Sequence, residues 1–348
     1  MRIAVDVMGG DHGCKVVVSG VKLALENSER IQSLLLVGQQ SVVEAALQES
    51  DCTDPRVQIV HASEVLTMED KPVAAVRRKK DSSLVRSIEL VKEGRADAVI
   101  SPGNTGGLVA ASTLKLRTLP GVDRPGIATV IPAPENEFVL LDSGANIDCK
   151  PRHLLEYAIM GNVYSREILG VNSPRVGILS IGTEAIKGNE LTLEAYKLCQ
   201  KAPLNFIGNV EGHDLFNNRV DVVVCDGFVG NIVLKTCESL ARGMLLWLKS
   251  ELKANLKRKL GALLAQNAFR TIARRMDPDG YGGAPLLGLN GHVMKAHGSA
   301  RERAIMNALL LTAESIRHNV NQHIIDEIAA AQQSLGSDLQ TNGTPTPA

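Results

Sequence analysis

The sequence predicts an α/β fold built on a mainly parallel sheet with helices on both faces. Short β-rich runs alternate with longer helical segments along most of the 348 residues, a pattern typical of parallel sheets with crossover helices. Several strand runs are apolar throughout, such as LLLV at 34–37 and VVVC at 222–225. Strands that are buried on both faces have this composition. The 31 glycines in a chain with only 3% aromatic residues indicate many tight turns.

The elements follow from aliphatic runs that end at glycine, proline, asparagine or aspartate, and from apolar residues at helical spacing. Strands are expected at residues 2–7, 34–37, 57–60, 97–101, 126–131, 138–141, 175–181, 204–207, 221–225, 286–289 and 293–295. Helices are expected at 16–26, from 41 onward, and at 107–117, 153–169, 190–199, 231–276 and 299–333. The last of these is a long helix or a helix pair, and the strands at 126–131 and 138–141 resemble a pair that is antiparallel.

We expect one α/β catalytic domain over residues 1–333, with a basic amphipathic helical insertion at about 244–276. The tail at 334–348 is polar and rich in turn residues, so we expect it to be disordered. The N-terminus does not resemble a signal peptide, and no apolar run is long enough to span a membrane.

The charge balance and the cysteines exclude several classes of protein. With 38 basic and 38 acidic side chains, the net charge is zero, so the chain lacks the basic character of a nucleic-acid binder. The six cysteines form no CxxC pair, which disfavours a disulfide framework or structural zinc site and favours reduced, buried thiols in the cytoplasm. No metal or cofactor is expected.

Five glycine-rich loops follow predicted strands, at residues 6–13, 102–107, 142–146, 182–188 and 226–231. Ligands bind at the carboxyl ends of strands in α/β sheets, and glycine lets backbone N–H groups approach an anion closely. Each loop alone is as well explained by an ordinary turn, but together they favour a crevice for phosphate. The chain has neither a Walker A loop nor a GxGxxG fingerprint.

Polar side chains gather in or near these loops. Candidates for a hydrogen-bond network, a cation ligand or a base are Asp6, Asp11, Asp142, Glu184 and Asp226; each aspartate is equally compatible with a turn or N-cap role. Amides that can donate to an oxyanion are Asn104, Asn146 and Asn231. Cations that can neutralise phosphate are Lys187, Lys235 and Lys295, and groups that can transfer protons are His12 and His297. No GxSxG elbow is present, and Cys225 fits the core better than a nucleophilic site.

The helical segment at 244–276 is strongly basic, with eight cations against the single carboxylate of Glu251. Its cations are Lys249, Lys253, Lys257, Arg258, Lys259, Arg270, Arg274 and Arg275. Leucines recur at spacings of three and four from 245 to 263, which forms one helical stripe. Such a helix suits an anionic membrane surface or an acidic protein partner. A core or dimer-interface role for the stripe is the alternative.

The loops resemble those of the bacterial acyl-[acyl carrier protein]:phosphate acyltransferases of phospholipid synthesis. The similar segments include AVDVMGGDHG, KPVAAVRRKKDSSL, SPGNTGGLVAAS, VLLDSGANIDCKP, SIGTEAIKGNEL, VVVCDGFVGNIVLKTCESL and GYGGAPLLGLNGHVMKAHG, and the resemblance spans roughly residues 2–318. The sequence departs from the family at Val7, where alanine is usual, and at Gly13-Cys14, where alanine and proline are frequent.

This resemblance implies a Rossmann-like three-layer α/β/α sandwich of the isopropylmalate-dehydrogenase type, in a homodimer. It implies that fatty acyl-[acyl carrier protein] and inorganic phosphate give acyl phosphate and free acyl carrier protein. The product would pass to a membrane glycerol-3-phosphate acyltransferase. The protein would work in the cytoplasm, peripherally associated with the inner face of the membrane.

As a hypothesis for the mechanism, phosphate attacks the thioester carbonyl directly. Phosphate would be held by the N–H groups of Gly9, Gly10, Gly103, Thr105, Gly106 and Gly227, with charge neutralised by Lys187. Asn104 or Asn231 would stabilise the oxyanion, and Asp11 or His12 would manage the proton. The acyl chain would lie in an apolar groove between residues 245–264 and a dimer mate. The alternatives are a phosphotransacetylase-like enzyme using coenzyme A, a metal- and NAD-dependent dehydrogenase, and a non-catalytic membrane-recruited scaffold.

Overall fold

The computed structural model describes residues 1–277 and 280–341, in which the strands form two sheets. The seven-stranded sheet has the order β3 (Val57–His61), β2 (Ser33–Gly38), β1 (Arg2–Asp6), β4 (Ala98–Ser101), β12 (His292–Lys295), β11 (Ala284–Leu287), β5 (Gly126–Ile127). The five-stranded sheet has the order β6 (Thr129–Pro132), β7 (Glu137–Leu141), β10 (Val222–Val224), β8 (Val176–Leu179), β9 (Phe206–Val210). Pairing is parallel except at β11 and between β6 and β7. The α/β class is confirmed, but the expectation that the loops follow one sheet is wrong.

Helices cover both faces of the seven-stranded sheet. One core cluster packs α1 (Gly13–Asn27), α2 (Gln40–Glu49) and α11 (Glu302–Arg317) on one face. Another packs α4 (Ser83–Lys92) and α5 (Thr105–Leu116), with the short α3 (Pro72–Arg78), on the other. The sequence-based prediction missed α3 and α4, although Pro72 at the first helical position is a recognised start signal.

The five-stranded sheet is covered mainly on one face, by α6 (Pro151–Leu169), α7 (Glu190–Lys201) and α12 (Val320–Thr341). A smaller cluster around Phe138, the 3-10 turn η1 (Asp214–Phe216) and Cys225 covers the other face. Cys225 is therefore a core residue, as predicted, and all six cysteines are free thiols. The expectation of disorder at 334–348 is wrong up to Thr341, because Leu335 packs against the core and α12 continues; residues 342–348 lie outside the described chain.

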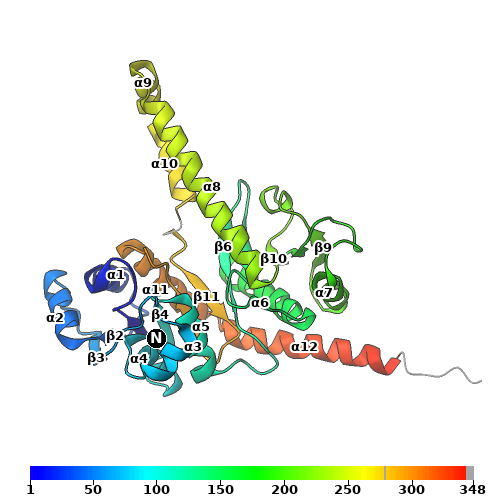
Figure 1. Cartoon of the computed structure of the whole chain (residues 1–348), viewed down its shortest axis with the longest axis horizontal. Helices are drawn as coiled ribbons and strands as arrows, with labels where there is room; N and C mark the ends of the chain where they lie inside the picture. Colours follow the sequence, from blue (N-terminus) through cyan, green and yellow to red (C-terminus); the bar gives the residue numbers. More distant parts are fainter. Residues whose placement is uncertain (278–279, 342–348) are drawn as a thin grey trace, which may run out of the picture.

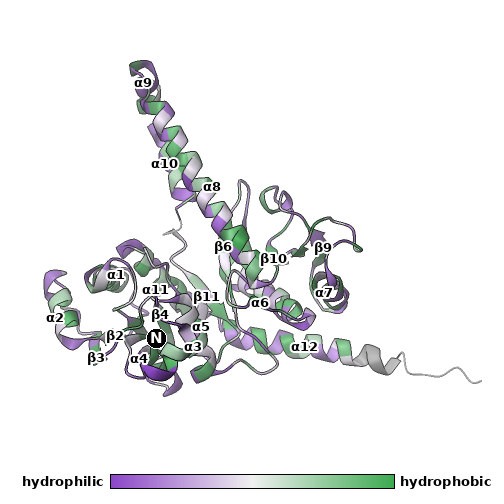
Figure 2. Ribbon diagram, in the orientation of Figure 1, coloured by the Kyte–Doolittle hydropathy of each residue, from purple (hydrophilic) through white to green (hydrophobic). Residues whose placement is uncertain are grey.

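A long helical arm leaves the five-stranded lobe (Figure 1). It consists of α8 (Gly227–Lys253), α9 (Leu256–Leu264) at the tip and α10 (Gln266–Arg275), which returns toward the body. The predicted insertion at 244–276 is thus the outer part of a longer element. Only Gly227 and Gly230 are buried in α8, and no residue is buried in α9 or α10. Polar and apolar residues alternate along the arm in Figure 2.

Within the described part of the chain, no helix combines the length and the apolar character needed to cross a membrane.

Candidate active site

Three loops meet at the carboxyl ends of β1, β4 and β12. The N–H of Asp11 donates to the carbonyl of Gly298 (2.8 Å), and the N–H of Ala296 donates to the carbonyl of Ser101 (3.1 Å). Gly9 packs directly on Gly103, since a Cβ on Gly9 would lie 2.6 Å from the Gly103 nitrogen. Glycine is required at this contact because any side chain would separate the loops. The predicted phosphate loops at 6–13 and 102–107 are therefore neighbours in space.

Asp6 fixes the geometry beneath these loops. Its buried carboxylate accepts hydrogen bonds from Ser83 Oγ (2.6 Å) and Ser101 Oγ (2.7 Å). Ser101 Oγ in turn accepts the N–H of Gly103 (3.0 Å). Burial raises the pKa of Asp6, and the hydroxyl donors oppose that rise by stabilising the charged form. Of the open interpretations, the structure supports the hydrogen-bond network, with Ser83 as a member that the sequence did not reveal.

Asp142 plays the matching role in the second lobe. Its buried carboxylate accepts the backbone N–H groups of Ile127 (3.0 Å), Gly144 (3.1 Å) and Asn146 (2.7 Å), among others. Burial raises the pKa of Asp142, while these donors lower it. Because these N–H groups come from two separate segments, the carboxylate ties the 142–146 loop to β5.

Two residues expected at the phosphate have other partners. The N–H of Gly227 donates to the Asn146 carbonyl (2.7 Å), so it is not available to an anion. The amide of Asn146 donates to the Pro125 carbonyl (2.6 Å) and to Tyr157 Oη (2.9 Å), so it also serves the protein interior. Asp226 caps α8 by accepting the N–H groups of the next turn, which is the N-cap role left open by the sequence.

Asn104 caps α5 rather than presenting a free amide. Its side-chain oxygen accepts the N–H of Gly107 (2.8 Å), and its Nδ2 donates to the carbonyls of Thr67 (3.2 Å) and Met68 (3.3 Å). Both ends of the amide are thus engaged, which disagrees with its expected role as an oxyanion donor. The exposed residues that begin the helix, Thr105 and Gly106, keep the outward N–H groups of a first helical turn.

Charged side chains from both lobes surround the loops. Lys295 Nζ, at the end of β12, donates to the carbonyl of Pro102 (3.2 Å). Desolvation, together with the positive charge of Lys235 on α8, lowers the pKa of Lys295 to about 8 against the opposing carboxylates of Asp6 and Asp11. Burial first, and Lys235 next, lower the pKa of His297 as well. Lys295, Asp11 and His297 therefore influence one another electrostatically. Lys235 acts on Lys295 and His297 as well, and it also forms an ion pair with Glu238 (2.8 Å).

His297 is oriented by its own loop. The N–H of Ser299 donates to His297 Nδ1 (3.2 Å), so in the neutral ring this nitrogen is an acceptor and Nε2 carries the proton. Asp11 lies next to it, because a Cβ on Gly298 would be 3.4 Å from the Asp11 carboxylate. Asp11 and His12 are exposed, whereas Gly9 is buried and Gly10 is partly buried beside Pro102.

The remaining predicted residues lie on the five-stranded lobe. Asn231 is exposed and faces the 142–146 loop, 3.5 Å from where a Cβ on Gly144 would be. Glu184 and Lys187 are exposed on the loop after β8, where the carbonyls of both residues accept hydrogen bonds from Asn209 (2.8 and 3.2 Å). In the described structure Lys187 forms no ion pair, and its backbone groups bond with Glu184, Ser180 and Asn209 of the same lobe. All the predicted arm cations are exposed: Lys253, Lys257, Arg258, Lys259, Arg270, Arg274 and Arg275.

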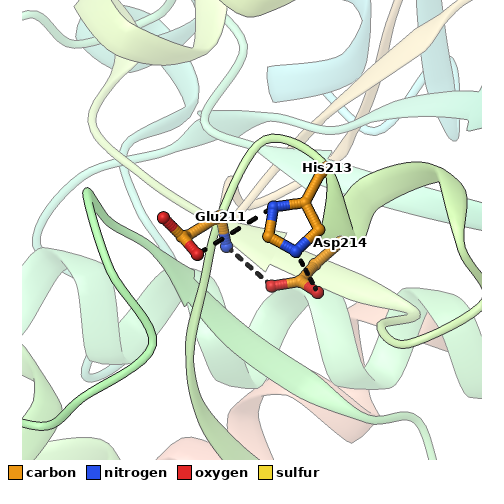
Figure 3. A group of neighbouring side chains, drawn as sticks. All are labelled: Glu211, His213 and Asp214. Carbon is orange, nitrogen blue, oxygen red and sulfur yellow. Dashed lines mark hydrogen bonds and ion pairs between the residues drawn. The ribbon is translucent and has the colours of Figure 1, made fainter.

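A cluster of potential metal ligands, Glu211, His213 and Asp214, follows β9 (Figure 3). His213 Nε2 lies 3.4 Å from Asp214 Oδ1, and its Nδ1 lies 3.9 Å from Glu211 Oε2. The buried Asp214 also accepts from Arg219 (3.1 Å) and from the N–H of Glu211 (3.0 Å). Because Arg219 already supplies positive charge to Asp214, this cluster is satisfied as an ion-pair network without a bound cation.

The structure is an α/β fold in which the glycine-rich loops after β1, β4 and β12 form the candidate site, with Lys235 of the other lobe acting on it electrostatically. Solved structures with this fold include a phosphotransacetylase from Streptococcus pyogenes, with a TM-score of 0.58 and 19% identity over 91% of this chain and 94% of that one. The EutD phosphotransacetylase from Staphylococcus aureus gives a TM-score of 0.56 and 18% identity over 90% and 94% of the two chains. These likenesses support the predicted layered fold.

Sequence comparison identifies the family. The model of the fatty acid synthesis protein family matches residues 1–323. A phosphate acyltransferase from Desulfitobacterium hafniense (strain DSM 10664 / DCB-2) is 49% identical over 96% of this chain and all of its own length. Another, from Desulforudis audaxviator, is 47% identical over 99% of both chains. The chain belongs to this family and is an acyltransferase, as the resemblance of its loops indicated.

Proposed function

We propose that the protein transfers a fatty acyl group from acyl carrier protein to inorganic phosphate, for phospholipid synthesis. The observation that carries this proposal is the position of Lys295 beside two glycine loops and the N-terminus of α5. A cation and several outward N–H groups at one place suit a small, doubly charged anion. The family supports the acyl transfer, and phosphate acts as the nucleophile.

In the proposed step, a phosphate oxygen attacks the thioester carbonyl, the new C–O bond forms and the C–S bond breaks. The thiolate of the carrier leaves and takes up a proton. Phosphate is held by N–H groups of Gly10, Thr105 and Gly106 and by Lys295, with Gly9 and Gly103 shaping the cradle through their contact. Asp11, His12 or His297 manages the proton at the exposed rim.

Asn231 is our candidate for the oxyanion donor, because its amide is exposed and lies on the opposite lobe from the phosphate cradle. One such donor contributes about 3 kcal/mol to transition-state stabilisation in enzymes of acyl transfer. Asn104 is instead a positioning residue for the α5 N-terminus. Lys235 adds positive charge from the second lobe, because its charge acts on both Lys295 and His297.

The arm has the character of a membrane- and partner-binding element. Its outer part carries exposed leucines at Leu256 (75% exposed), Leu263 (64%) and Leu264 (90%) beside the basic side chains. Apolar residues flanked by cations favour an anionic bilayer surface. We propose that the protein is a cytoplasmic homodimer that associates peripherally with the membrane, where acyl phosphate passes to a glycerol-3-phosphate acyltransferase. The arm of a dimer mate would help to form the acyl-chain groove.

The test is a phosphate-dependence assay with palmitoyl-[acyl carrier protein]. Acyl phosphate is trapped as the hydroxamate, and the free carrier is followed by mass. Phosphate-dependent formation of both products is the expected result. Equal activity with palmitoyl-coenzyme A would favour the phosphotransacetylase-like alternative, loss of thioester without phosphate would indicate a thioesterase, and vesicle binding without turnover would indicate a scaffold.

A further inference from the structure

The segment from 68 to 80, which contains α3, forms an exposed basic surface that the proposed reaction does not use. It carries five cations, Lys71, Arg77, Arg78, Lys79 and Lys80, against the two carboxylates of Glu69 and Asp70. Two apolar side chains are also exposed on it, Met68 (54%) and Val73 (50%). We call these residues the α3 surface. Mixed cationic and apolar exposure is typical of a protein-binding surface rather than of a solvated helix.

The α3 surface adjoins the phosphate cradle. A Cβ on Gly106, at the α5 N-terminus, would lie 2.7 Å from Pro72 Cγ, and one on Gly298 would lie 3.5 Å from Met68 Cε. Asn104 joins the two elements through its bonds to the Thr67 and Met68 carbonyls. Figure 1 shows α3 beside α5 on the seven-stranded lobe. A partner bound to this surface would therefore stand at the edge of the site.

Hydrogen bonds anchor the start of this surface, where the ionised Asp70 is paired with Lys79 and leaves the other cations unpaired by it except for Arg78. Asp70 accepts from Lys79 Nζ (2.6 Å) and from the N–H of Thr67 (2.8 Å), and these bonds lower its pKa to about 2. Lys79 also donates to the Val65 carbonyl (2.9 Å). Among the described residues, Lys71, Arg77 and Lys80 form no ion pair. These cations are thus free to meet charge on a partner, and little conformational entropy of the backbone is lost when they do.

We propose that the α3 surface docks the acidic protein that carries the acyl thioester, an inference that rests on the proposed function. Charge complementarity supports it, because an acidic carrier protein meets free cations here and apolar contacts at Met68 and Val73. Position supports it over the arm. At 1.5 Å rise per residue, Lys253 lies roughly 30 Å along α8 from Asn231. A carrier at the α3 surface instead borders Gly106 directly.

The test is the double variant Arg77→Glu/Lys80→Glu, with Lys92→Glu/Arg95→Glu as its matched control. The control residues are exposed at the end of α4 and just beyond it, before β4 begins, so they lie near the amino end of β4, whereas the α3 surface adjoins the loop at its carboxyl end. We expect the first variant to raise KM for acyl-[acyl carrier protein] by about 10- to 100-fold, the range of electrostatic steering. Its kcat at saturation and its KM for phosphate should stay at wild-type values, and the control should match the wild type throughout.

Several results would overturn the inference. One is an unchanged KM for the thioester, and another is an equal rise in the control, which would reflect net charge alone. A rise in KM for phosphate instead would assign the surface to phosphate entry. If KM for the thioester rose only when the charges of Lys253, Lys257 and Lys259 were reversed, carrier docking would be assigned to the arm. Circular dichroism verifies that each variant is folded. If the wild type itself shows no phosphate-dependent turnover, the proposed function fails, which is a distinct outcome.

Discussion

Helices α6 and α8 are both long and amphipathic, yet α6 is largely buried and α8 is largely exposed. The 19-residue α6 buries thirteen residues against the five-stranded sheet, whereas the 27-residue α8 buries only Gly227 and Gly230. Apolar side chains as large as Trp247 (68% exposed) remain uncovered on the arm. Apolar exposure on this scale is costly in water, so the arm lacks the packing that stabilises α6 within the described chain.

The largest expected difference is between a Gly→Ala substitution in the buried first turn of α8 and one in its exposed middle. A Cβ on Gly230 would lie 1.9 Å from the Asp142 carbonyl oxygen, whereas one on Gly243 would meet nothing within 4 Å. We expect Gly230→Ala to lower the free energy of unfolding by more than about 3 kcal/mol. Gly243→Ala should be neutral or raise it by up to about 1 kcal/mol. Denaturant titration of both variants measures this contrast, which equal effects would contradict.

Replacement of Lys295, a partly buried cation in the body, should affect substrate binding more than stability. We expect Lys295→Met to raise KM for phosphate by roughly 100-fold, since a hydrogen-bonded charge contact contributes about 2–3 kcal/mol. The melting temperature should not fall, because burial disfavours the charged lysine. Lys187→Met on the exposed loop is the matched control, with a smaller expected rise. If the two variants lost equal affinity for phosphate, Lys295 would have no special position in the site.

On the arm, polar substitutions should alter membrane binding without altering stability. Leu256→Gln/Leu264→Gln removes two exposed side chains, each of which can contribute about 1.5 kcal/mol or more on burial. Affinity for anionic phospholipid vesicles, measured by co-sedimentation, should fall by at least roughly tenfold, with unfolding unchanged within about 0.5 kcal/mol. Ile186→Gln, an exposed position on the loop after β8, serves as the control. Destabilisation by the arm variant would show that these leucines are covered within the protein.

The smallest expected effect is on the pH dependence of KM for phosphate, which we attribute to Lys295 in the body and not to the arm. Because the pKa of Lys295 is lowered from 10.5 to about 8, the side chain is charged below about pH 8 and loses its charge above it. KM for phosphate should therefore rise several-fold between pH 7.5 and pH 8.5, with the added rise absent in Lys295→Met. Steady-state kinetics across this range, at constant ionic strength, provide the measurement. A rise that persists in the variant would come from phosphate or another group.

The glycine loops were predictable because local backbone requirements leave a direct trace in sequence. Gly9 and Gly103 lie in loops after strands and Gly106 in the first turn of α5, close to where they were expected, and Asp6 and Asp142 end their strands as buried acceptors. The roles of individual side chains were less predictable. Asn104 and Gly227 have suitable chemistry for an anion site, but their hydrogen-bonding groups are used by Gly107 and Asn146. Tertiary packing determines the hydrogen-bond partners of these groups, and a sequence motif does not specify that packing.

The sequence by itself determined the alternation of strands and helices, the family and the positions of the loops, because each depends on short-range pattern or on many ordered motifs. Only the tertiary structure decided that the strands form two sheets, that Lys295 contacts the loop at Pro102 while Lys187 lies on the loop after β8, and that α3 adjoins the α5 N-terminus. The physical reason is distance. Charge and hydrogen bonding act over a few ångströms, yet they join segments as far apart in sequence as Asp11 and Gly298, and only the packed chain brings those segments together.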